Sequence, residues 1–483
     1  MEQPVFELKR NLRGTVARAA LLAASAYLLA APVSAESLNE ALAAAYRYNP
    51  SLDAQRAFLR AQDENVARAM SGYRPVITGS ADVNYQYNNT RPDTLGEGES
   101  KPRGYSVDAV QPIFNGFQTV YAVKTQEANV RAGRETLRSV EQQVLGDAVT
   151  AYMDVVRDQA IVRLRENNVN VLTRELKATQ DRFSVGEVTR TDVAQAQARR
   201  AGAVSALDLA RANLKTSRAT YERVIGHAPD AVTEPHGFES ALPKSLEEAI
   251  QQGTHENPAV VGALYAEEAA RHSVDQIRGQ LLPSVQLEAN YTDRFPGGGP
   301  TSLTESETTT VTGRLTVPIY EGGDVYAQVR QAKQNQVGFM QQIEQARSET
   351  EANVVAAWSR LLAAKAQTES GKSQVEANTT ALTGVREEER VGQRTLLDVL
   401  NAEVELLNSQ VELVTIRRDY VVSSYAVLAT IGRLDAVSLG LTAVAYDPEA
   451  HYHEVRRKPW GTSITPAESG RGGAWEATVE PVK

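Results

Sequence analysis

The sequence predicts an α+β membrane protein in which one module occurs twice, each copy joining two β-strands to a long helical hairpin. Three observations predict this. Short motifs recur in the same order, two segments of each copy alternate between apolar and polar residues, and two long stretches contain no proline. With 483 residues, 42% of them hydrophobic and 23% charged, the chain has enough apolar residues to bury a core.

The first 35 residues have the layout of a secretory signal peptide. Basic residues Lys9 and Arg10 precede an apolar run from Ala19 to Ala31, and the small residues Val33-Ser34-Ala35 follow it. The run is shorter than the roughly 20 residues that a transmembrane helix needs. We therefore expect residues 1–35 to be a signal peptide and the mature chain to be exported.

Composition excludes several classes of function. A formal net charge of −9 without a basic run argues against a nucleic-acid partner. The chain has no cysteine, and its six histidines are scattered. No Ser/His/Asp order, phosphate-binding glycine loop or cluster of metal ligands appears, so we expect no enzyme activity, no cofactor and no metal.

Motifs that recur in order indicate that the module has been duplicated. Early motifs recur 208 positions later and later ones 206 positions later, so one two-residue slip separates them. A loop would tolerate such a slip. We expect a first repeat over residues 36–230, a linker over 231–244 and a second repeat over 245–433. The matched positions are Ser37/Ser245, Asn49-Pro50/Asn257-Pro258, Pro75/Pro283, Pro112/Pro318, Gly116/Gly322, Gly186/Gly392, Thr189/Thr395, Asp192/Asp398 and Ile225-Gly226/Ile431-Gly432.

Each repeat opens with a helical segment, at about 37–72 and 245–280. Ser37 and Ser245 are each followed three positions later by a glutamate, Glu40 and Glu248, which is the pattern of a capping box. An Asn-Pro pair interrupts both segments, because the residue before proline leaves the helical region. We therefore expect each segment to be two helices.

Strands follow at about 76–88, 104–112, 284–294 and 308–318, where apolar and polar residues alternate. Strands of this length, apolar on one face and polar on the other, suit a water-filled membrane barrel. Four strands leave open edges that are costly in lipid, so several chains would have to share one barrel. The alternative is a soluble sheet with its apolar face turned inward, in a periplasmic coiled-coil protein with a structural or interaction role and no channel.

Long helical stretches cover about 118–182 and 323–389. At 1.5 Å per residue each makes a rod of about 100 Å. Seven-residue spacing of apolar residues, as in Val162, Val169, Leu176 and Phe183 or Leu400, Leu407, Val414 and Val421, predicts packing as in a coiled coil. Each rod turns back at a glycine-containing bend, with tips near 184–190 and 390–395.

At these bends the sequence resembles the TolC family of outer-membrane efflux and secretion channels. The residues are Arg182-Phe183-Ser184-Val185-Gly186-Glu187-Val188-Thr189-Arg190-Thr191-Asp192-Val193 and Arg390-Val391-Gly392-Gln393-Arg394-Thr395-Leu396-Leu397-Asp398-Val399-Leu400. Pro112-Ile113-Phe114-Asn115-Gly116 and Pro318-Ile319-Tyr320-Glu321-Gly322 are similar to the strand-to-helix signature of that family.

The resemblance implies a homotrimer in the outer membrane lipid. Its twelve-stranded transmembrane β-barrel, with four strands from each chain, would be continued by a long α-helical coiled-coil barrel across the periplasm. A periplasmic adaptor protein and an inner-membrane transporter would dock at the tips. The chain would passively conduct substrate in a tripartite efflux system or a type I secretion system, with the tips slightly more similar to the secretion branch.

The resemblance also implies gate residues. Asp398 matches an aspartate that projects into the entrance, where three carboxylates would favour cations. The family often has a second acidic position three residues later, where this chain has Asn401. Arg394 matches an arginine tied to the aspartate that is Asp192 here. A tyrosine often joins this latch, and Glu389 stands in its place, either paired with a basic residue or solvated.

The tip residues Val185-Gly186 and Val391-Gly392 match positions that contact the adaptor in the family. Glycine at these positions also suits the end of a helix, where the backbone takes a positive φ. Beyond the second repeat, residues 434–483 would form a C-terminal equatorial segment and, from about Asp447, a flexible tail with several proline and glycine residues.

Overall fold

The computed structural model describes residues 36–88, 98–229, 231–235, 238–297, 304–441 and 446–464. The predicted signal peptide and the last 19 residues lie outside them. The described residues form two compact units. Unit 1 draws on Met1–Asn49, Leu145–Leu242 and Leu361–Tyr425, and unit 2 on Pro50–Val144, Pro243–Arg360 and Ala426–Lys483. Helices α4, α8 and α9 contribute residues to both units.

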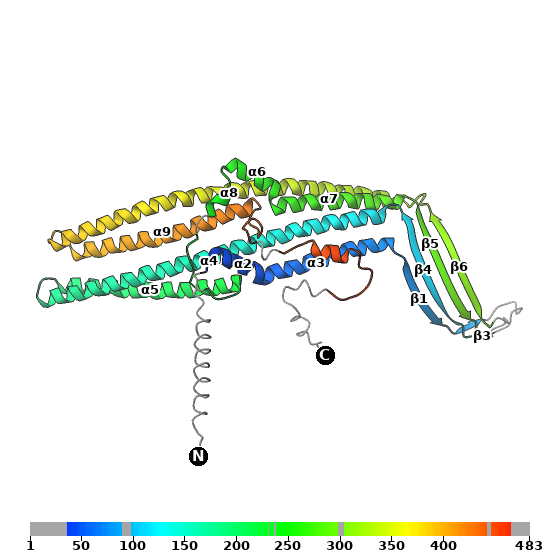
Figure 1. The fold of residues 1–483 in the computed structure, drawn as a ribbon, viewed down its shortest axis with the longest axis horizontal. Coiled ribbons are helices and arrows are strands. Elements are labelled where there is room, and N and C mark those ends of the chain that lie inside the picture. Colours follow the sequence, from blue (N-terminus) through cyan, green and yellow to red (C-terminus); the bar gives the residue numbers. More distant parts are fainter. Residues whose placement is uncertain are drawn as a thin grey trace, which may run out of the picture. The chain divides into compact units, whose positions relative to one another are not determined.

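One order of elements occurs twice along the chain (Figure 1). Two short helices precede two strands, and a long and a shorter helix follow. The first series is α2 (Leu38–Tyr48), α3 (Pro50–Met70), β1 (Val76–Val83), β4 (Arg103–Asn115), α4 (Gln118–Ser184) and α5 (Arg190–Ile225). The second is α6 (Leu246–Glu256), α7 (Pro258–Arg278), β5 (Ser284–Phe295), β6 (Ser306–Thr316), α8 (Asp324–Arg390) and α9 (Leu396–Thr430).

Smaller elements complete the described chain. Strands β2 (Gln86–Asn88) and β3 (Gly98–Ser100) pair with each other only, so β1 ends at Val83 and not at residue 88. The 3-10 turns are η1 (Ser71–Tyr73), η2 (Phe238–Ala241) and η3 (Gly279–Leu281). The turn η2 lies within the predicted linker, and a last helix, α10, covers Ala450–Val455.

The Asn-Pro pairs separate the short helices as their sequence predicts. Asn49 and Asn257 have extended backbones, and a proline opens the next helix after each. The side-chain amide of Asn49 donates to the carbonyl of Val224 at 3.2 Å, and that of Asn257 donates to the carbonyl of Thr430 at 2.9 Å. Each asparagine therefore ties a helix break to the end of a long hairpin.

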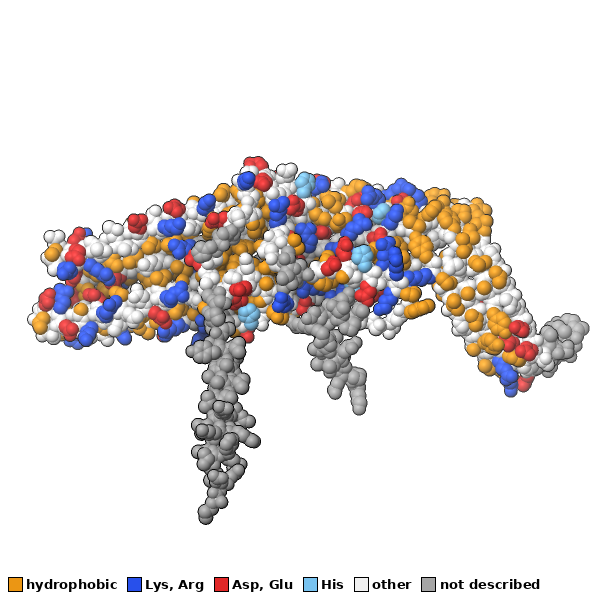
Figure 2. Space-filling model, viewed as in Figure 1, with side chains coloured by type: hydrophobic (Ala, Val, Ile, Leu, Met, Phe, Trp, Pro, Cys, Tyr) orange, Lys and Arg blue, Asp and Glu red, His pale blue; other side chains and the backbone are white. Residues whose placement is uncertain are grey.

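The strands form one antiparallel sheet in the order β1-β4-β5-β6. Pro112 lies in β4 beside a shift of register, the position in a sheet where proline is tolerated. One face is polar: Asn290 donates to Asp108 at 2.6 Å, and Arg314 pairs with Glu288 at 2.8 Å. The other face is apolar and exposed, with Val311 67% and Leu315 64% accessible. Figure 2 shows hydrophobic side chains gathered over these strands.

The core of unit 1 lies between its helices. Leu172 of α4, Ala203 of α5, and Leu396 and Leu400 of α9 form one buried cluster, against which Val169 packs. Leu407 and Val421 continue the seven-residue series and are buried too. Phe183, at the end of the other series, is 45% exposed, so that seam stops before the tip.

In unit 2 the expectation of a flexible tail does not hold for the helix α10. His451 is buried, and its Nδ1 lies 3.0 Å from Asp63 Oδ2 on α3. Tyr452 packs against the cluster of Val66, Val123 and Val130. The proline and glycine residues that suggested mobility flank this helix, while an aromatic and a histidine side chain anchor it.

Among the residues that the structure describes, none of the helices is both long enough and apolar enough to span a lipid bilayer.

Candidate functional site

The candidate site is the pair of bends in unit 1 that close the two helical hairpins, α4 to α5 and α8 to α9. Both bends have the same backbone geometry. The N–H groups of Gly186 and Glu187 donate to the carbonyls of Phe183 and Arg182, each at 3.0 Å. Those of Gly392 and Gln393 donate to the carbonyls of Glu389 and Glu388, each at 2.9 Å. Such paired bonds are the Schellman motif, and the left-handed residue in each is the glycine, with φ of 82° and 76°.

A capping box opens the helix after each bend. Asp192 Oδ2 accepts from the backbone N–H of Thr189 at 2.8 Å, and the Asp192 N–H donates back to the Thr189 hydroxyl at 3.3 Å. Asp398 and Thr395 repeat these contacts at 3.0 and 3.3 Å. The two aspartates are thus equivalent N-terminal caps, which satisfy backbone groups that a helix end leaves without partners.

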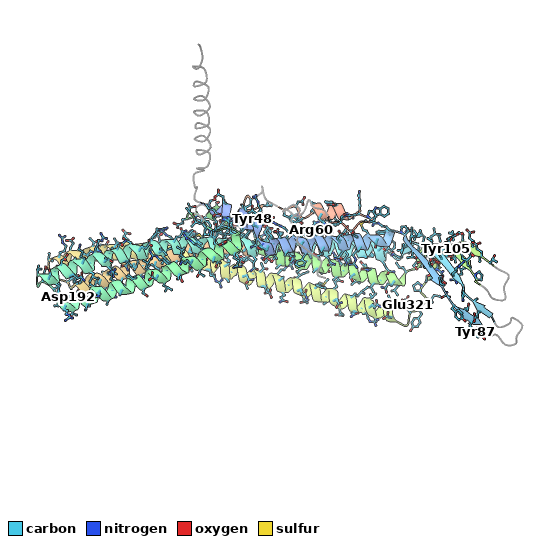
Figure 3. The ribbon with its side chains drawn as sticks, turned by 90° about the horizontal axis from the view of Figure 1, so that it is seen from below. Tyr48, Arg60, Tyr87, Tyr105, Asp192 and Glu321 are labelled. Atoms are coloured by element: carbon cyan, nitrogen blue, oxygen red, sulfur yellow. The ribbon has the colours of Figure 1, made fainter. Side chains whose placement is uncertain are left out.

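Asp398 stays charged well into the acidic range. Hydrogen bonds from the backbone N–H and the hydroxyl of Thr395, with a smaller contribution from Arg394, hold the pKa of its carboxyl below the ordinary value. Its side chain is partly exposed at the end of the hairpin. Figure 3 labels Asp192 at the corresponding place on the first hairpin.

An ion pair links the first hairpin to the second close to the tips. Arg182 Nη1 lies 2.8 Å from Glu389 Oε1, and Arg182 Nη2 lies 3.1 Å from Glu187 Oε1. Of the two outcomes that the sequence left open for Glu389, the structure therefore shows pairing with a base. The hydrogen bond to Glu389 is also the main cause that raises the pKa of Arg182.

The predicted latch between Arg394 and Asp192 is not formed within the chain. Arg394 Nε instead lies 3.0 Å from Glu388 Oε2, across its own bend. The Asp192 carboxylate is occupied by Thr189, because Asp192 stands at the third position of its helix. Pairing of Arg394 with Asp192 stays a prediction for the assembled channel.

A cluster of charges lies behind the tips, between α4, α8 and α9. Glu403 is buried and pairs with Arg386 at 2.6 Å, while its Oε2 atom has no hydrogen-bond partner in the described part of the chain. Glu175 of α4 is half-buried beside it. Burial raises the pKa of Glu175, and the carboxylates of Glu403 and Glu389 raise it further. Together with Arg182, the cluster holds three carboxylates against two guanidinium groups.

Asn401, where the family often has an acid, makes a second link between the hairpins. Its side-chain oxygen accepts a hydrogen bond from Arg199 of α5 at 2.8 Å. A neutral amide therefore binds an arginine of the other hairpin at the position where the family often has a second acid.

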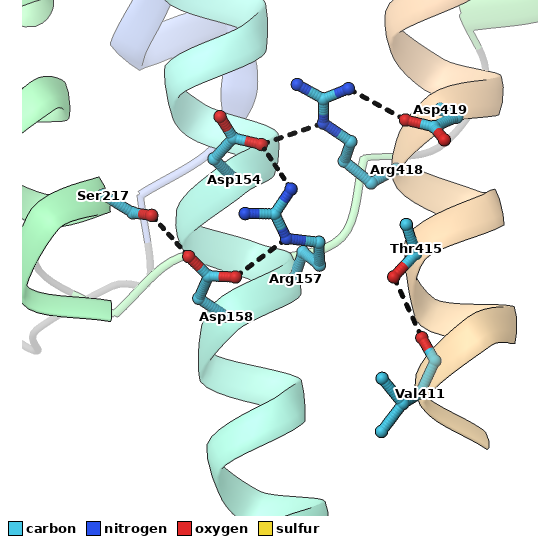
Figure 4. A network of polar contacts seen from close by, with 8 residues as sticks. All are labelled: Asp154, Arg157, Asp158, Ser217, Val411, Thr415, Arg418 and Asp419. Atoms are coloured by element: carbon cyan, nitrogen blue, oxygen red, sulfur yellow. Dashed lines mark hydrogen bonds and ion pairs between the residues drawn. The ribbon is translucent and has the colours of Figure 1, made fainter. Parts of the chain in front are cut away.

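A third link lies further from the tips (Figure 4). Arg418 of α9 pairs with Asp154 of α4 at 2.9 Å, and Arg157 bridges Asp154 and Asp158 at 3.0 and 2.8 Å. Asp158 also accepts from the hydroxyl of Ser217 on α5. In this network each carboxylate has a partner, so it fixes α4, α5 and α9 to one another.

The predicted tip residues lie at the bends, and their adaptor contacts stay a prediction. Val185 and Val391 are 77% and 70% exposed. The sequence does not predict the partners of the gate residues, since Arg182 belongs to a longer motif and no pattern marks Glu403 or Glu175. Arg182 and Glu389 are 207 positions apart and do not match each other in the repeat, so no signal in one sequence connects them.

In the part of the chain described above, no three His, Cys, Asp or Glu side chains are gathered in one cluster. The site offers charged groups at two exposed helix ends and links between hairpins, which suit gating and docking.

Comparison with known proteins identifies the family. The model of the outer membrane efflux protein family matches residues 41–227 and 249–433. The chain is 39% identical over 461 residues to outer membrane efflux protein BepC of Brucella suis, covering 95% of this chain and 98% of that one. It is 26% identical over 422 residues to outer membrane protein TolC of Escherichia coli, covering 84% of each chain.

A solved structure shares the fold. The Campylobacter jejuni CmeC outer membrane channel has a TM-score of 0.73 and 16% sequence identity, covering 87% of this chain and 89% of that one. The two matched segments of the family model begin and end close to the two series of elements, and together they cover most of the chain. The chain therefore belongs to the outer membrane efflux protein family and is a TolC-family channel of the outer membrane that extends into the periplasm.

Proposed function

We propose that three copies of this chain form the outer-membrane exit duct of a tripartite efflux or type I secretion system. The observation that carries the proposal is the open sheet. Within the described residues, β1 and β6 each pair on one side only, and the apolar face of the sheet is not covered. An unpaired edge in hydrocarbon is costly, so β6 of one copy pairs with β1 of the next until a barrel closes.

The two faces of the sheet support a barrel with a wet interior. On the polar face, side chains of neighbouring strands form two hydrogen-bonded pairs, Asn290 with Asp108 and Arg314 with Glu288. Val311 and Leu315 are exposed on the opposite face, which would contact lipid. A soluble coiled-coil protein would have to bury that face. The alternative of a non-channel structural protein is therefore disfavoured by the same geometry.

The long helices would continue the barrel as a tunnel, and the tips would close it. Asp398 would then contribute three carboxylates around one entrance. Carboxylates around a narrow opening attract cations and repel anions. The cap that Thr395 provides fixes the position of this carboxylate and keeps it ionised.

Adaptor and transporter would dock at the hairpin ends. Val185 and Val391 are exposed apolar side chains on turns that the Schellman motifs hold rigid. A rigid apolar knob at each of six tips suits a helical partner that packs small side chains around it. The chain would supply no energy, which would come from the transporter.

Subunit number and conductance test the duct. The protein purified in detergent should be a trimer by native mass spectrometry and should conduct ions in planar bilayers. A monomer or dimer without conductance would refute the proposal.

Selectivity tests the role of Asp398. Asp398→Ala should move the reversal potential in a salt gradient toward zero and weaken block by multivalent cations. Glu387→Ala is the matched control, because it removes one carboxylate from the same tip, where Glu387 pairs with Arg390 on its own helix. If both variants leave the reversal potential unchanged, Asp398 does not line the constriction.

The transported class is tested in cells. Loss of secretion of a protein on deletion of this chain, with drug sensitivity unchanged, would favour type I secretion. Increased drug sensitivity with secretion intact would favour efflux, the activity named for the relative BepC.

A further inference from the structure

The apolar face of the sheet ends in two carboxylates that lie opposite each other. Asp293 of β5 is the register partner of Tyr105 on β4 and of Glu307 on β6. Register partners point to the same face of a sheet, and this face also carries Leu287 and Val311. The carboxylates lie near the end of the strands that is remote from the helices. Figure 2 shows acidic side chains at that end, next to the hydrophobic surface.

Asp293 is buried without a partner for one of its oxygens. Its exposed fraction is 6%, and its Oδ1 atom has no hydrogen-bond partner among the described residues. A buried carboxylate without a counter-charge is strongly unfavourable. Glu307 makes this worse, because like charges directly opposite in a sheet repel. Among the described residues, neither Asp293 nor Glu307 forms an ion pair with a basic side chain.

Neighbouring side chains prepare the site and do not neutralise it. The Tyr291 hydroxyl donates to Glu307 Oε1 at 3.0 Å and so orients that carboxylate. Arg103, the register partner of Phe295, also lies on this face, and its guanidinium carbon stands 5.4 Å from the centre of the Phe295 ring, stacked on it. The rings of Tyr105 and Tyr291, 6.2 Å apart, flank the acids.

We propose that Asp293 and Glu307 bind a hard divalent cation such as Ca²⁺ at this end of the sheet. Carboxylate oxygens are the ligands that such a cation prefers, and a bound cation neutralises both charges at once. The hydrogen bond from Tyr291 leaves the second oxygen of Glu307 available to the cation. Ca²⁺ takes six to eight oxygen ligands, so two carboxylates leave positions for further ligands. This is consistent with the absence of a three-residue metal cluster from the described segments.

The open positions face the level of lipid headgroups, a step that rests on the barrel proposed above. Because the helices extend into the periplasm, the remote strand ends lie in the outer leaflet. Water or the phosphate oxygens of a lipid would complete the coordination there. A cation shared in this way would anchor the outer rim of the channel to anionic lipid.

Terbium luminescence tests the cation site directly. Tb³⁺ replaces Ca²⁺ at oxygen sites and emits when a nearby tyrosine is excited, and Tyr105 and Tyr291 are neighbours of both acids. The detergent-purified protein should give saturable emission that Ca²⁺ displaces. Asp293→Asn and Glu307→Gln should each weaken binding at least about tenfold, because affinity follows the number of charged ligands. Glu307 is exposed, so its replacement leaves the fold intact.

Glu288→Gln is the matched control, since Glu288 lies on the polar face of the same strand and pairs with Arg314. It should leave Tb³⁺ emission unchanged. Absence of tyrosine-sensitised emission from the wild-type protein, or equal loss in all three variants, would overturn the proposal. So would a thermal midpoint that does not change with Ca²⁺. Binding is measured without conduction, so its failure is separate from failure of the duct.

Discussion

Replacing Glu389 by glutamine should raise the fraction of time that the channel is open. Glu389 is the only residue of the predicted gate that forms an ion pair with the other hairpin within the described chain. Its partner Arg182 lies on α4, so movement of α8 away from α4 breaks the pair. Glutamine keeps the size of the side chain and removes the charge. The expected change therefore reports the ion pair and not packing.

The magnitude follows from exposure. Arg182 is 39% and Glu389 is 18% exposed, so water partly screens their attraction. A pair of this kind stabilises the linked state by about 1 kcal/mol. In the proposed trimer, three pairs that break together amount to about 3 kcal/mol, a change in the open-to-closed ratio of about 150-fold. Three chains that move independently would each change about fivefold.

Single-channel recording measures this ratio. The matched control is Glu387→Gln, which removes the same charge from the same tip. Among the described residues, Glu387 forms its ion pair with Arg390 on its own helix and not with the other hairpin. Exchange of charges in an Arg182→Glu, Glu389→Arg double variant should restore much of the closed state. Equal effects of the Glu389 and Glu387 variants would show that net charge at the tip, and not the link, governs opening.

Three further outcomes are expected. Asn401→Asp should increase cation preference, because it adds a carboxylate one helical turn beyond Asp398, and an unchanged reversal potential would place position 401 away from the pore. The contribution of Glu175 to hairpin packing should be largest in acid and should be lost as pH rises through its raised pKa, since a group with a raised pKa stabilises its buried state only while protonated. Glu175→Gln should flatten this part of the dependence of open probability on pH, and an unaltered curve would exclude Glu175. His451→Ala should remove the hydrogen bond between His451 and Asp63 and destabilise the contact of α10 with α3 by about 2 kcal/mol, seen as faster amide exchange in both helices and not in α9.

Local rules in the sequence were enough to predict most elements of the fold. Asn-Pro pairs, capping residues and the change from one periodicity to another are short-range signals, and the helices α4 and α8 end within two residues of the expected bounds. The pairing of β4 with β5, which joins the two repeats in one sheet, depends on residues about 180 positions apart. Periodicity indicates that strands exist and does not indicate which strands pair.

The helix α10 shows where composition misleads. Proline and glycine around it predicted mobility, yet His451 and Tyr452 contact α3 and α4 side chains that the sequence places more than 300 positions earlier. The two histidines of this segment, His451 and His453, lie two positions apart in the sequence. Their surroundings give them different roles, since His451 is buried against Asp63 and His453 is 66% exposed near Glu449.

Comparison of the two repeats distinguishes the residues that shape each tip from the residues that link the two hairpins. Positions that match across the repeats have the same structural role, since Gly186 and Gly392 end helices, and Asp192 and Asp398 cap them. A duplicated role of this kind cannot by itself distinguish one hairpin from the other. The ion pair between the hairpins uses positions where the two repeats differ. Arg182 of the first repeat corresponds to Glu388 of the second, and its partner Glu389 corresponds to Phe183 of the first. Divergence after duplication therefore placed the residues that bind one hairpin to the other at positions where the two copies disagree.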